Sequence, residues 1–447
     1  MTGQSTQISN YLDALTYFYS YAHYNPADVS NWSLDRLKGL LARLGDPHKK
    51  FPSLLIAGTK GKGSTAAMAE SMLRQAGYKT GLYTSPHLHS FRERIRLGGE
   101  AITEEQVVAL ARSLKPYFDD TPHLTAFELI TAVAFVAFAE ANIEAAILEV
   151  GLGGRLDATN AVDPAVAVIT SISYDHMQIL GDTLTLIARE KAGIIRPDAL
   201  VISAPQYDEA MQMIEQVCAD HRARLVLVGR DWQWQPGEFN FEGQSFRVCE
   251  QDYWLPLMGE HQLVNAVTAM AAVAGFGERT GLAVVPEAVK RGLAEVNWLG
   301  RLELLQHNPF LIVDSAMNGD SAEKLTLALR HYFPERPITF IFGASSDHPI
   351  RDMLNALLPH AARMFTVASR HPRAENAERL AVLAAELGYP VTPLPDMTAA
   401  LERTLAEAAP DDLICVTGSL FLVADAREAW LRRQGLPLPA IDPVVVS

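Results

Sequence analysis

The chain has 447 residues, of which 49% are hydrophobic and 20% charged, and its formal net charge is −14 at pH 7. This composition is typical of a globular protein and excludes a disordered chain. Single hydrophobic cores usually stop growing at about 250 to 300 residues, so the length predicts two domains. The negative charge disfavours a nucleic-acid partner, which needs a broad cationic face. An anionic substrate would therefore have to meet positive charge that is concentrated locally.

No segment is typical of a membrane span or a secretion signal. The longest apolar stretch, Leu129 to Ala139, lies between Glu128 and Glu140 and is much shorter than the ~20 residues that cross a bilayer. It predicts a buried helix, and we expect no membrane partner. The polar start, MTGQSTQISN, lacks the features of a signal peptide, which favours a cytoplasmic location. The three cysteines have no CxxC spacing, which argues against a disulfide framework and a zinc cluster.

The first half of the chain alternates apolar runs with helix-period stretches, in the order expected of βαβ units. A capping box of Thr103 and Gln106 predicts the start of a helix that reaches about Tyr117. Other helices are predicted over Ser64–Gly77 and around Leu129–Ala139. The predicted strands are Ser53–Gly58, Lys79–Ser85, Ala145–Gly151 and Ala165–Ile172. This pattern predicts a doubly wound α/β domain.

The pattern changes after Asp231. Short aromatic and polar segments up to Met258 predict a small antiparallel sheet, and helical segments follow from about Gln262 to Val296. A second alternation after Gly300 contains the predicted strands LIVDSA, ITFIFGA, MFTVAS and DLICVTGS. The sequence therefore predicts an N-terminal domain over residues 1–298 and a smaller, Rossmann-like α/β domain over residues 299–447.

The segment GTKGKGST stands between a predicted strand and a predicted helix. At such a turn, backbone N–H groups and the positive helix end can bind phosphate oxygens. The strict P-loop spacing fails, because Ile56 occupies the place of its first glycine. Lys62 would neutralise nucleotide phosphates, while the glycines permit close approach and positive φ. A glycine-rich turn without a ligand is the alternative. The expected binding residues are Gly58, Thr59, Lys60, Gly61, Lys62, Gly63 and Ser64.

Further motifs follow this loop along the chain: YTSPHLHSFRERI, LEVGLGGRLDATN, ISYDHMQILG, REKAGI, GEHQLVNAV, LGRLELL and TGSLFLV. Together they resemble, in family order and over nearly the whole chain, the folylpolyglutamate synthase and dihydrofolate synthase family, a branch of the Mur-type ligases. The resemblance implies a P-loop-type ATPase domain followed by a glutamate-ligase domain, with the substrates meeting in the cleft between them.

The resemblance also implies metal chemistry. Ser85, Glu149 and His176 match family ligands of a Mg²⁺ ion that bridges the ATP phosphates, and Mg²⁺ prefers such sparse, oxygen-rich coordination. Lys191 matches a lysine that becomes carbamylated and binds a second Mg²⁺. Lys62, Lys191 and His176 are thus the candidate catalytic residues. Without the family, His176 could be a structural residue, Glu149 a buried paired carboxylate, and Lys191 a surface lysine paired with Glu190.

Other matching positions concern the substrates. By resemblance, Asn265, Arg301 and Asp314 contact ATP, and Arg155 and Ser419 lie on the side of the other substrates. Taken alone, the first three could be a helix amide, a linker salt bridge and an ordinary aspartate at a strand end.

The implied reaction is the ATP-dependent addition of L-glutamate to a folate or pteroate carboxylate through an acyl phosphate. The implied partners are these small molecules, and the family favours a monomer. Two alternatives remain open: a Mur-type amide ligase for another carboxylate, and an ATP-binding relative that has lost turnover.

Three segments of the chain depart from the family pattern. Where the family has D-G-A-H-N-P, this chain reads Asp314 to Gly319 as DSAMNG, so Met317 replaces a histidine. A thioether cannot carry a proton or donate a strong hydrogen bond. Lys60 replaces a common asparagine, and His348 stands where a lysine is usual. We expect the ATP and Mg²⁺ chemistry to be retained and the choice of acceptor or amino acid to be open to change.

Overall fold

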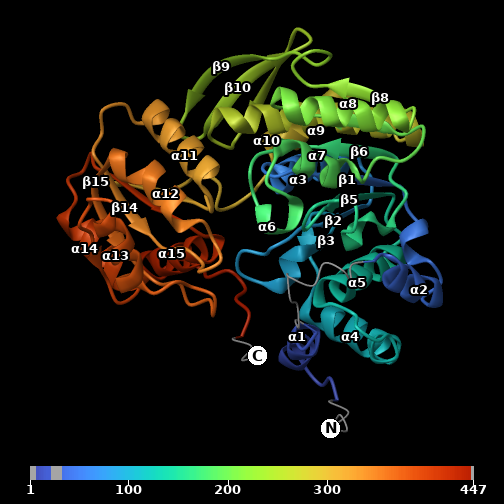
Figure 1. The fold of residues 1–447 in the computed structure, drawn as a ribbon, viewed down its shortest axis with the longest axis horizontal. Coiled ribbons are helices and arrows are strands. Elements are labelled where there is room, and N and C mark those ends of the chain that lie inside the picture. Colours follow the sequence, from blue (N-terminus) through green and yellow to red (C-terminus); the bar gives the residue numbers. More distant parts are fainter. Residues whose placement is uncertain (1–6, 22–32, 444–447) are drawn as a thin grey trace.

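A computed structural model describes residues 7–21 and 33–443 of the chain. It contains an N-terminal α/β domain with a largely parallel sheet and a separate C-terminal α/β domain, which the chain enters after α10 (Pro286–Ala294) (Figure 1). The predicted fold class is confirmed. The boundary placed at residues 298 and 299 stays a prediction. In the described ranges no helix is both long and apolar enough to cross a membrane.

The N-terminal sheet has the strand order β4-β3-β2-β5-β1-β6-β7-β8. Strand β1 pairs in parallel with β5 on one side and β6 on the other, while β3 and β4 form an antiparallel edge. The strands are β1 (Ser53–Ala57), β2 (Thr80–Tyr83), β3 (Ile95–Leu97), β4 (Glu100–Ala101), β5 (Ala145–Glu149), β6 (Val166–Ile169), β7 (Leu200–Ser203) and β8 (Arg224–Leu227).

Helices cover both faces of this sheet, because successive side chains of a buried strand point to opposite faces. Leu55 of β1 packs in one apolar cluster and Leu54 in the other. The Leu55 face carries α1 (Tyr11–Tyr19), α2 (Asp35–Arg43), α4 (Glu104–Asp119), α5 (Ala126–Glu140), α7 (Leu184–Ala192) and α8 (Asp208–Asp220). The Leu54 face carries α3 (Lys62–Gln75), α9 (Glu260–Thr280) and α10 (Pro286–Ala294). A short α6 (Met177–Leu180) and the 3₁₀ turns η2 (Pro47–Lys49), η3 (Phe91–Arg94) and η4 (Ala158–Ala161) lie in the connections.

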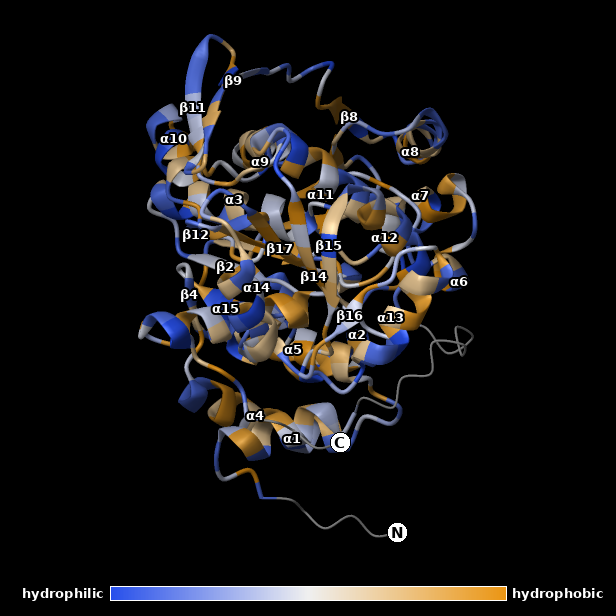
Figure 2. Cartoon of the chain, turned by 90° about the vertical axis from the view of Figure 1, so that its left-hand side faces the viewer, coloured by the Kyte–Doolittle hydropathy of each residue, from blue (hydrophilic) through white to orange (hydrophobic). Residues whose placement is uncertain are grey.

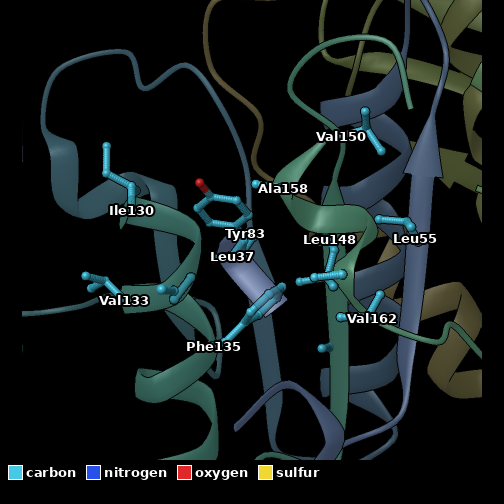
Figure 3. Packing of buried hydrophobic residues seen from close by; sticks show 14 of the residues in the cluster. Leu37, Leu55, Tyr83, Ile130, Val133, Phe135, Leu148, Val150, Ala158 and Val162 are labelled. Atoms are coloured by element: carbon cyan, nitrogen blue, oxygen red, sulfur yellow. The ribbon is translucent and has the colours of Figure 1, made fainter. Parts of the chain in front are cut away.

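Local sequence explains where the helices start and end. The predicted capping box at Thr103 is present at the start of α4. The apolar stretch predicted to be a buried helix forms α5, and Figure 3 shows its Phe135 reaching toward Leu148 of β5. The predicted helical region up to residue 296 is divided, because Gly281 adopts a positive φ of 80° at the end of α9 and Pro286 begins α10.

The predicted antiparallel sheet consists of β9 (Gln235–Asn240), β10 (Gly243–Val248) and β11 (Gln251–Leu255). The C-terminal sheet has the order β12-β13-β17-β14-β15-β16, and Figure 2 shows hydrophobic residues gathered on its central strands. Its elements are β12 (Glu303–His307), β13 (Phe310–Asp314), α11 (Gly319–Tyr332), β14 (Ile338–Phe342), α12 (Ile350–Leu357), η5 (Leu358–His360), β15 (Ala361–Thr366), α13 (Ala377–Glu386), β16 (Thr392–Pro393), α14 (Met397–Glu407), β17 (Leu413–Thr417) and α15 (Leu420–Gln434).

Polar contacts connect the domains beside the chain segment that follows β2. The buried His89 ring lies 3.2 Å from the Glu428 carboxylate and 2.7 Å from Arg427, both on α15. Past that helix, the Asp442 carboxylate accepts hydrogen bonds from Tyr11 and Ser90, each at 2.8 Å. These contacts tie the C-terminal segment to the N-terminal domain.

Replacing Leu148 by alanine tests the core at β5. Leu148 is fully buried, so the change leaves a cavity, and we expect a loss of about 3 kcal/mol in the free energy of unfolding. The measurement is urea unfolding followed by circular dichroism. The control is Leu327→Ala, because Leu327 is 71% exposed. Equal effects of the two substitutions would contradict the packing described here.

Candidate active site in the cleft between the domains

A cleft of about 270 Å³ lies between the two domains. The N-terminal domain contributes residues that follow β1, β2, β5 and β6, whose carboxyl ends meet at one edge of the sheet, where α/β proteins commonly bind ligands. The C-terminal domain contributes residues near β13 and α11. Of the candidates from the sequence, the lining contains Gly58, Thr59, Lys60, Gly61, Lys62, Gly63, Ser64, Ser85, Glu149, His176, Lys191, Asn265, Arg301 and Asp314.

The glycine-rich loop runs from the end of β1 to the start of α3, as predicted. The backbone N–H groups of Thr59 and Lys60 donate to the carbonyl of Ser171, at 2.9 and 3.1 Å. The Thr59 hydroxyl bonds to the backbone of Ser173, beyond β6. The loop is therefore held on the neighbouring strand connection, while the first N–H groups of α3 face the cleft, as anion binding requires.

Two glycines of the loop stand where no larger residue fits. Gly61 has a φ of 87°, and a Cβ there would lie 2.2 Å from the side-chain oxygen of Asn265. At Gly58, with a φ of 148°, a Cβ would lie 1.9 Å from the Thr170 hydroxyl. Asn265 is held by a hydrogen bond to Gln262, one turn earlier on α9. The loop thus packs against α9 by backbone contact, which places the Asn265 amide beside it.

Two lysines lie close to the loop. The Lys62 ammonium donates to the carbonyl oxygens of Gly58, at 3.1 Å, and Thr59, at 3.4 Å. Lys191, on α7, donates to the same Gly58 carbonyl at 2.9 Å and is only 4% exposed. Burial, and then the charge of Lys62, lower the pKa of Lys191 to about 7. The surface-lysine interpretation of Lys191 is therefore wrong, because Glu190 pairs instead with Arg155.

Glu149 ends β5 and is 7% exposed. Its carboxylate accepts a hydrogen bond of 3.0 Å from the backbone N–H of Ser85, which lies two residues after the end of β2. Burial raises the pKa of Glu149, while the charge of Lys62 opposes this shift. A buried carboxylate with a single hydrogen bond gains from a cation nearby.

His176 and its neighbour Asp175 follow β6. His176 has a left-handed backbone with a φ of 49°, an uncommon conformation for this residue type, and its N–H donates to the Asp175 carboxylate at 3.0 Å. That carboxylate also forms a salt bridge of 3.1 Å with Lys60. Lys60, one of the departures from the family pattern, is thus balanced by Asp175 inside the cleft.

Arg301 and Asp314 bring the C-terminal domain to the cleft. The Asp314 carboxylate accepts from the N–H groups of Leu302 and Ala316, each at 2.9 Å. The Arg301 guanidinium donates to the Ser315 hydroxyl and to the carbonyl of Gly300. Burial raises the pKa of Asp314, and the charge of Arg301 opposes this. The two groups face the phosphate loop from the other domain.

Several polar lining residues were not predicted from the sequence. Asp175 stands next to His176 in a motif already singled out, and its acidic side chain beside a candidate ligand was the available signal. Lys324 pairs with Asp320 at 2.9 Å on the first turns of α11. Beside them lies Met317, which the sequence already marked as a departure from the family, and its backbone N–H donates to the Ser321 hydroxyl. Nothing local in the sequence marks the α11 residues as part of the cleft wall.

Two candidate residues lie outside the cleft lining. Arg155 forms a salt bridge of 3.0 Å with Glu190 and lines a different hollow. Ser419 is buried and caps α15, where its hydroxyl accepts from the N–H of Leu422. The structure does not bring these two residues together with the phosphate loop, and a role for them on the substrate side stays a prediction.

Comparisons with known proteins agree with this geometry. The Mur ligase middle domain matches residues 56–273, and the Mur ligase glutamate ligase domain matches residues 300–420. The fold and the cleft therefore define a Mur-type ligase. The dihydrofolate synthase/folylpolyglutamate synthase of Bacillus subtilis is 36% identical over 406 residues, which cover 88% of this chain and 94% of that relative. The resemblance inferred from the motifs is confirmed, and the chain belongs to the dihydrofolate synthase/folylpolyglutamate synthase family.

Solved structures extend the similarity to the whole fold. Escherichia coli FolC in complex with DHPP and ADP matches with a TM-score of 0.85 and 32% identity, over 97% of this chain and 100% of that one. The folylpolyglutamate synthase of Mycobacterium tuberculosis, complexed with ADP and AMPPCP, matches with a TM-score of 0.82 and 33% identity, over 89% and 95% of the two chains.

The contact between Gly61 and Asn265 can be tested by Gly61→Ala. The added methyl group would clash with the Asn265 side chain, so the loop must shift, and we expect ATP affinity to fall at least about tenfold. The measurement is a calorimetric titration with ATP. Gly77→Ala is the control, because Gly77 also has a positive φ, of 92°, but has open space around it. A similar loss of affinity in both variants would contradict the steric explanation.

Proposed function

We propose that this chain catalyses the ATP-dependent addition of L-glutamate to a folate-type carboxylate. The observation that carries the proposal is the cleft itself, which joins the phosphate loop, Lys62 and Lys191 of one domain to Arg301 and Asp314 of the other. The names of the similar proteins and their ADP and AMPPCP complexes support ATP as the co-substrate. Dihydropteroate and tetrahydrofolate polyglutamate are the proposed acceptors.

In the proposed reaction, a carboxylate oxygen of the acceptor attacks the γ-phosphorus of ATP, and the bond to the ADP oxygen breaks. Lys62 and the N–H groups at the start of α3 stabilise the charge on the transferring group, so catalysis rests mainly on position and electrostatics. The amine of glutamate then attacks the acyl phosphate, loses a proton and displaces phosphate, which leaves an amide. Arg301 and Asp314, from the opposite domain, would hold ATP while the cleft excludes water.

The residues present fit a Mg²⁺ ion beside the phosphates. Glu149 is a buried carboxylate with one hydrogen bond, and Ser85 and His176 line the same cleft. In the part of the chain that the structure describes, no three His, Cys, Asp or Glu side chains form a metal site by themselves, so phosphate oxygens and water would complete the coordination. Such an ion would neutralise charge on the phosphates.

Carbamylation of Lys191 is the second proposed feature of the site. The reaction with CO₂ needs a neutral amine, which is populated when burial lowers the pKa of Lys191 to about 7. The carbamate would place a carboxylate beside the phosphate loop and could hold a second Mg²⁺. As further proposals, the protein acts as a monomer in the cytoplasm, with its domain boundary at residues 298 and 299.

Product formation tests the proposed function directly. Purified protein with ATP, Mg²⁺ and L-glutamate should release ADP with dihydropteroate or tetrahydrofolate, and mass spectrometry should detect an acceptor that has gained one glutamyl residue. Lys62→Ala is the control against contaminating ATPases, and we expect its turnover to fall at least about 100-fold. Absence of a glutamylated product with either acceptor would contradict the proposed substrate.

A Mur-type amide ligase with another acceptor is the second candidate function. It is favoured by one observation: the altered segment with Met317 lines the cleft and presents a thioether there. ADP release with a different acid or amine, and none with the two folates, would favour it. ATP binding without ADP release under any substrate pair would instead indicate a relative that has lost turnover.

Lys191→Ala tests the carbamate. Loss of this group should lower turnover at least about tenfold, and formate or acetate should restore part of it by filling the space with a carboxylate. Lys62→Ala is the matched control, because short acids cannot replace its positive charge. Turnover that stays unchanged in Lys191→Ala, or equal rescue of both variants, would contradict the proposed carbamate.

A further inference from the structure

A second hollow, of about 340 Å³, lies in the N-terminal domain. Its wall is formed by the start of α2, by η2, by the connection after β5 and by the turn after α7. None of its lining residues also lines the cleft. Helix α2 lies on the side of the N-terminal domain that faces away from the C-terminal domain (Figure 1). The hollow is therefore separate from the site described above.

The wall of this hollow is strongly cationic. It carries the side chains of Lys38, Lys49, Arg155 and Arg196, whereas Asp163 is the only acidic residue among the described residues of the lining. The chain as a whole has a net charge of −14, so this cluster of positive side chains has the opposite sign to the charge of the whole chain. Positive charge gathered in a concave, partly desolvated surface attracts anions.

The nearby carboxylates do not neutralise the hollow. Lys49 pairs with Asp46 at 2.9 Å, but the two side chains are 66% and 39% exposed. Arg155 pairs with Glu190 and is 54% exposed. Exposed pairs of this kind are weak, so both cations can turn toward a ligand at small cost. Lys38 has no side-chain hydrogen bond or ion pair with any residue in the described ranges.

Arg196 is already oriented. One nitrogen of its guanidinium, Nη2, donates to the backbone and side-chain oxygens of Asn160, each at 2.8 Å, and to the carbonyl of Val162 at 3.0 Å. These acceptors are neutral. The nearest carboxylate is Asp163, at 4.0 Å from Nε and with a 90% exposed side chain. The guanidinium is thus rigidly held and lacks a close counterion, as in arginines that recognise carboxylates or phosphates.

His48 supplies an independent observation. The residue is 7% exposed, its ring packs against Phe135 with 6.1 Å between the centroids, and it lines the hollow. Its Nδ1 atom is buried and has no hydrogen-bond partner among the described residues. An unpaired buried nitrogen costs free energy unless a ligand or water meets it. As the N–H tautomer, Nδ1 can donate to an anion.

We propose that this hollow binds a small anion that carries carboxylate or phosphate groups. The oriented Arg196 and the buried His48 form the fixed part of the site, and Lys38, Lys49 and Arg155 close around the ligand. Two sources supply this chemistry if the proposed function holds: inorganic phosphate, which the reaction releases, and an oligo-γ-glutamyl chain, which it lengthens. The binding site itself depends only on the charges and the unpaired nitrogen.

Calorimetry of the full chain at low ionic strength tests the proposal, with inorganic phosphate and tri-γ-glutamate as separate probes. A saturating non-hydrolysable ATP analogue with Mg²⁺ keeps the phosphate loop occupied. The test variant is Lys38→Gln/Lys49→Gln. The control is Lys50→Gln/Lys79→Gln, which removes the same charge from two exposed lysines outside the hollow. Because binding and not turnover is measured, failure here is distinct from failure of the proposed function.

We expect the affinity for one or both probes to fall at least about tenfold in the test variant and by less than about twofold in the control. Binding of phosphate alone or of tri-γ-glutamate alone identifies the source. Equal affinities in the two double variants, or no binding by the unmodified chain at millimolar concentration, would overturn the proposal. Should the test variant melt at a lower temperature, Lys38→Gln alone is used, and it should still weaken binding about threefold or more.

Discussion

The position of β1 between β5 and β6 is the constraint on which the site depends. Because the three strands run parallel, their carboxyl ends meet at one edge, and the residues that follow them face each other there. This brings Gly58, Glu149 and Asp175 together although long stretches of chain separate them. Burial of these short strands on both faces makes their register costly to change. The geometry of the cleft therefore rests on apolar packing rather than on its own polar contacts.

Charges in this cleft are only partly paired. Lys60 forms a salt bridge with Asp175. Among the described residues, Lys191 donates only to a carbonyl oxygen and Glu149 accepts only from a backbone N–H group. The last two groups are buried without a charged partner in direct contact, which is unfavourable in the empty cleft. The proposed nucleotide with its Mg²⁺ would supply both signs of charge at once. Burial of Lys191 and Glu149 without charged partners destabilises the empty cleft. Relief of this cost would therefore contribute to the affinity for the nucleotide.

The hollow beside α2 is also suited to an anion, but its charged side chains are almost all positive. Its cations come from four separate segments of the N-terminal domain, and the segments with Arg155 and Gly193 form its boundary toward Lys191. The N–H of Arg155 donates to the carbonyl of Glu190 at 2.8 Å, so one short stretch of backbone separates the two sites. The N-terminal domain thereby presents two anion-attracting surfaces on opposite sides of one loop.

The sequence by itself determined the local features: the strands β1, β2, β5 and β6 within three residues at either end, the capped start of α4, and the phosphate loop. These depend on neighbours in the chain. Short or half-exposed strands such as β4 and β12 carry too weak an apolar pattern to be predicted. Only the tertiary structure decided that Lys60 pairs with Asp175 and that Arg155 pairs with Glu190 and lines the hollow beside α2 instead of the cleft, because contacts between distant residues are set by strand order and helix packing, which no local pattern encodes.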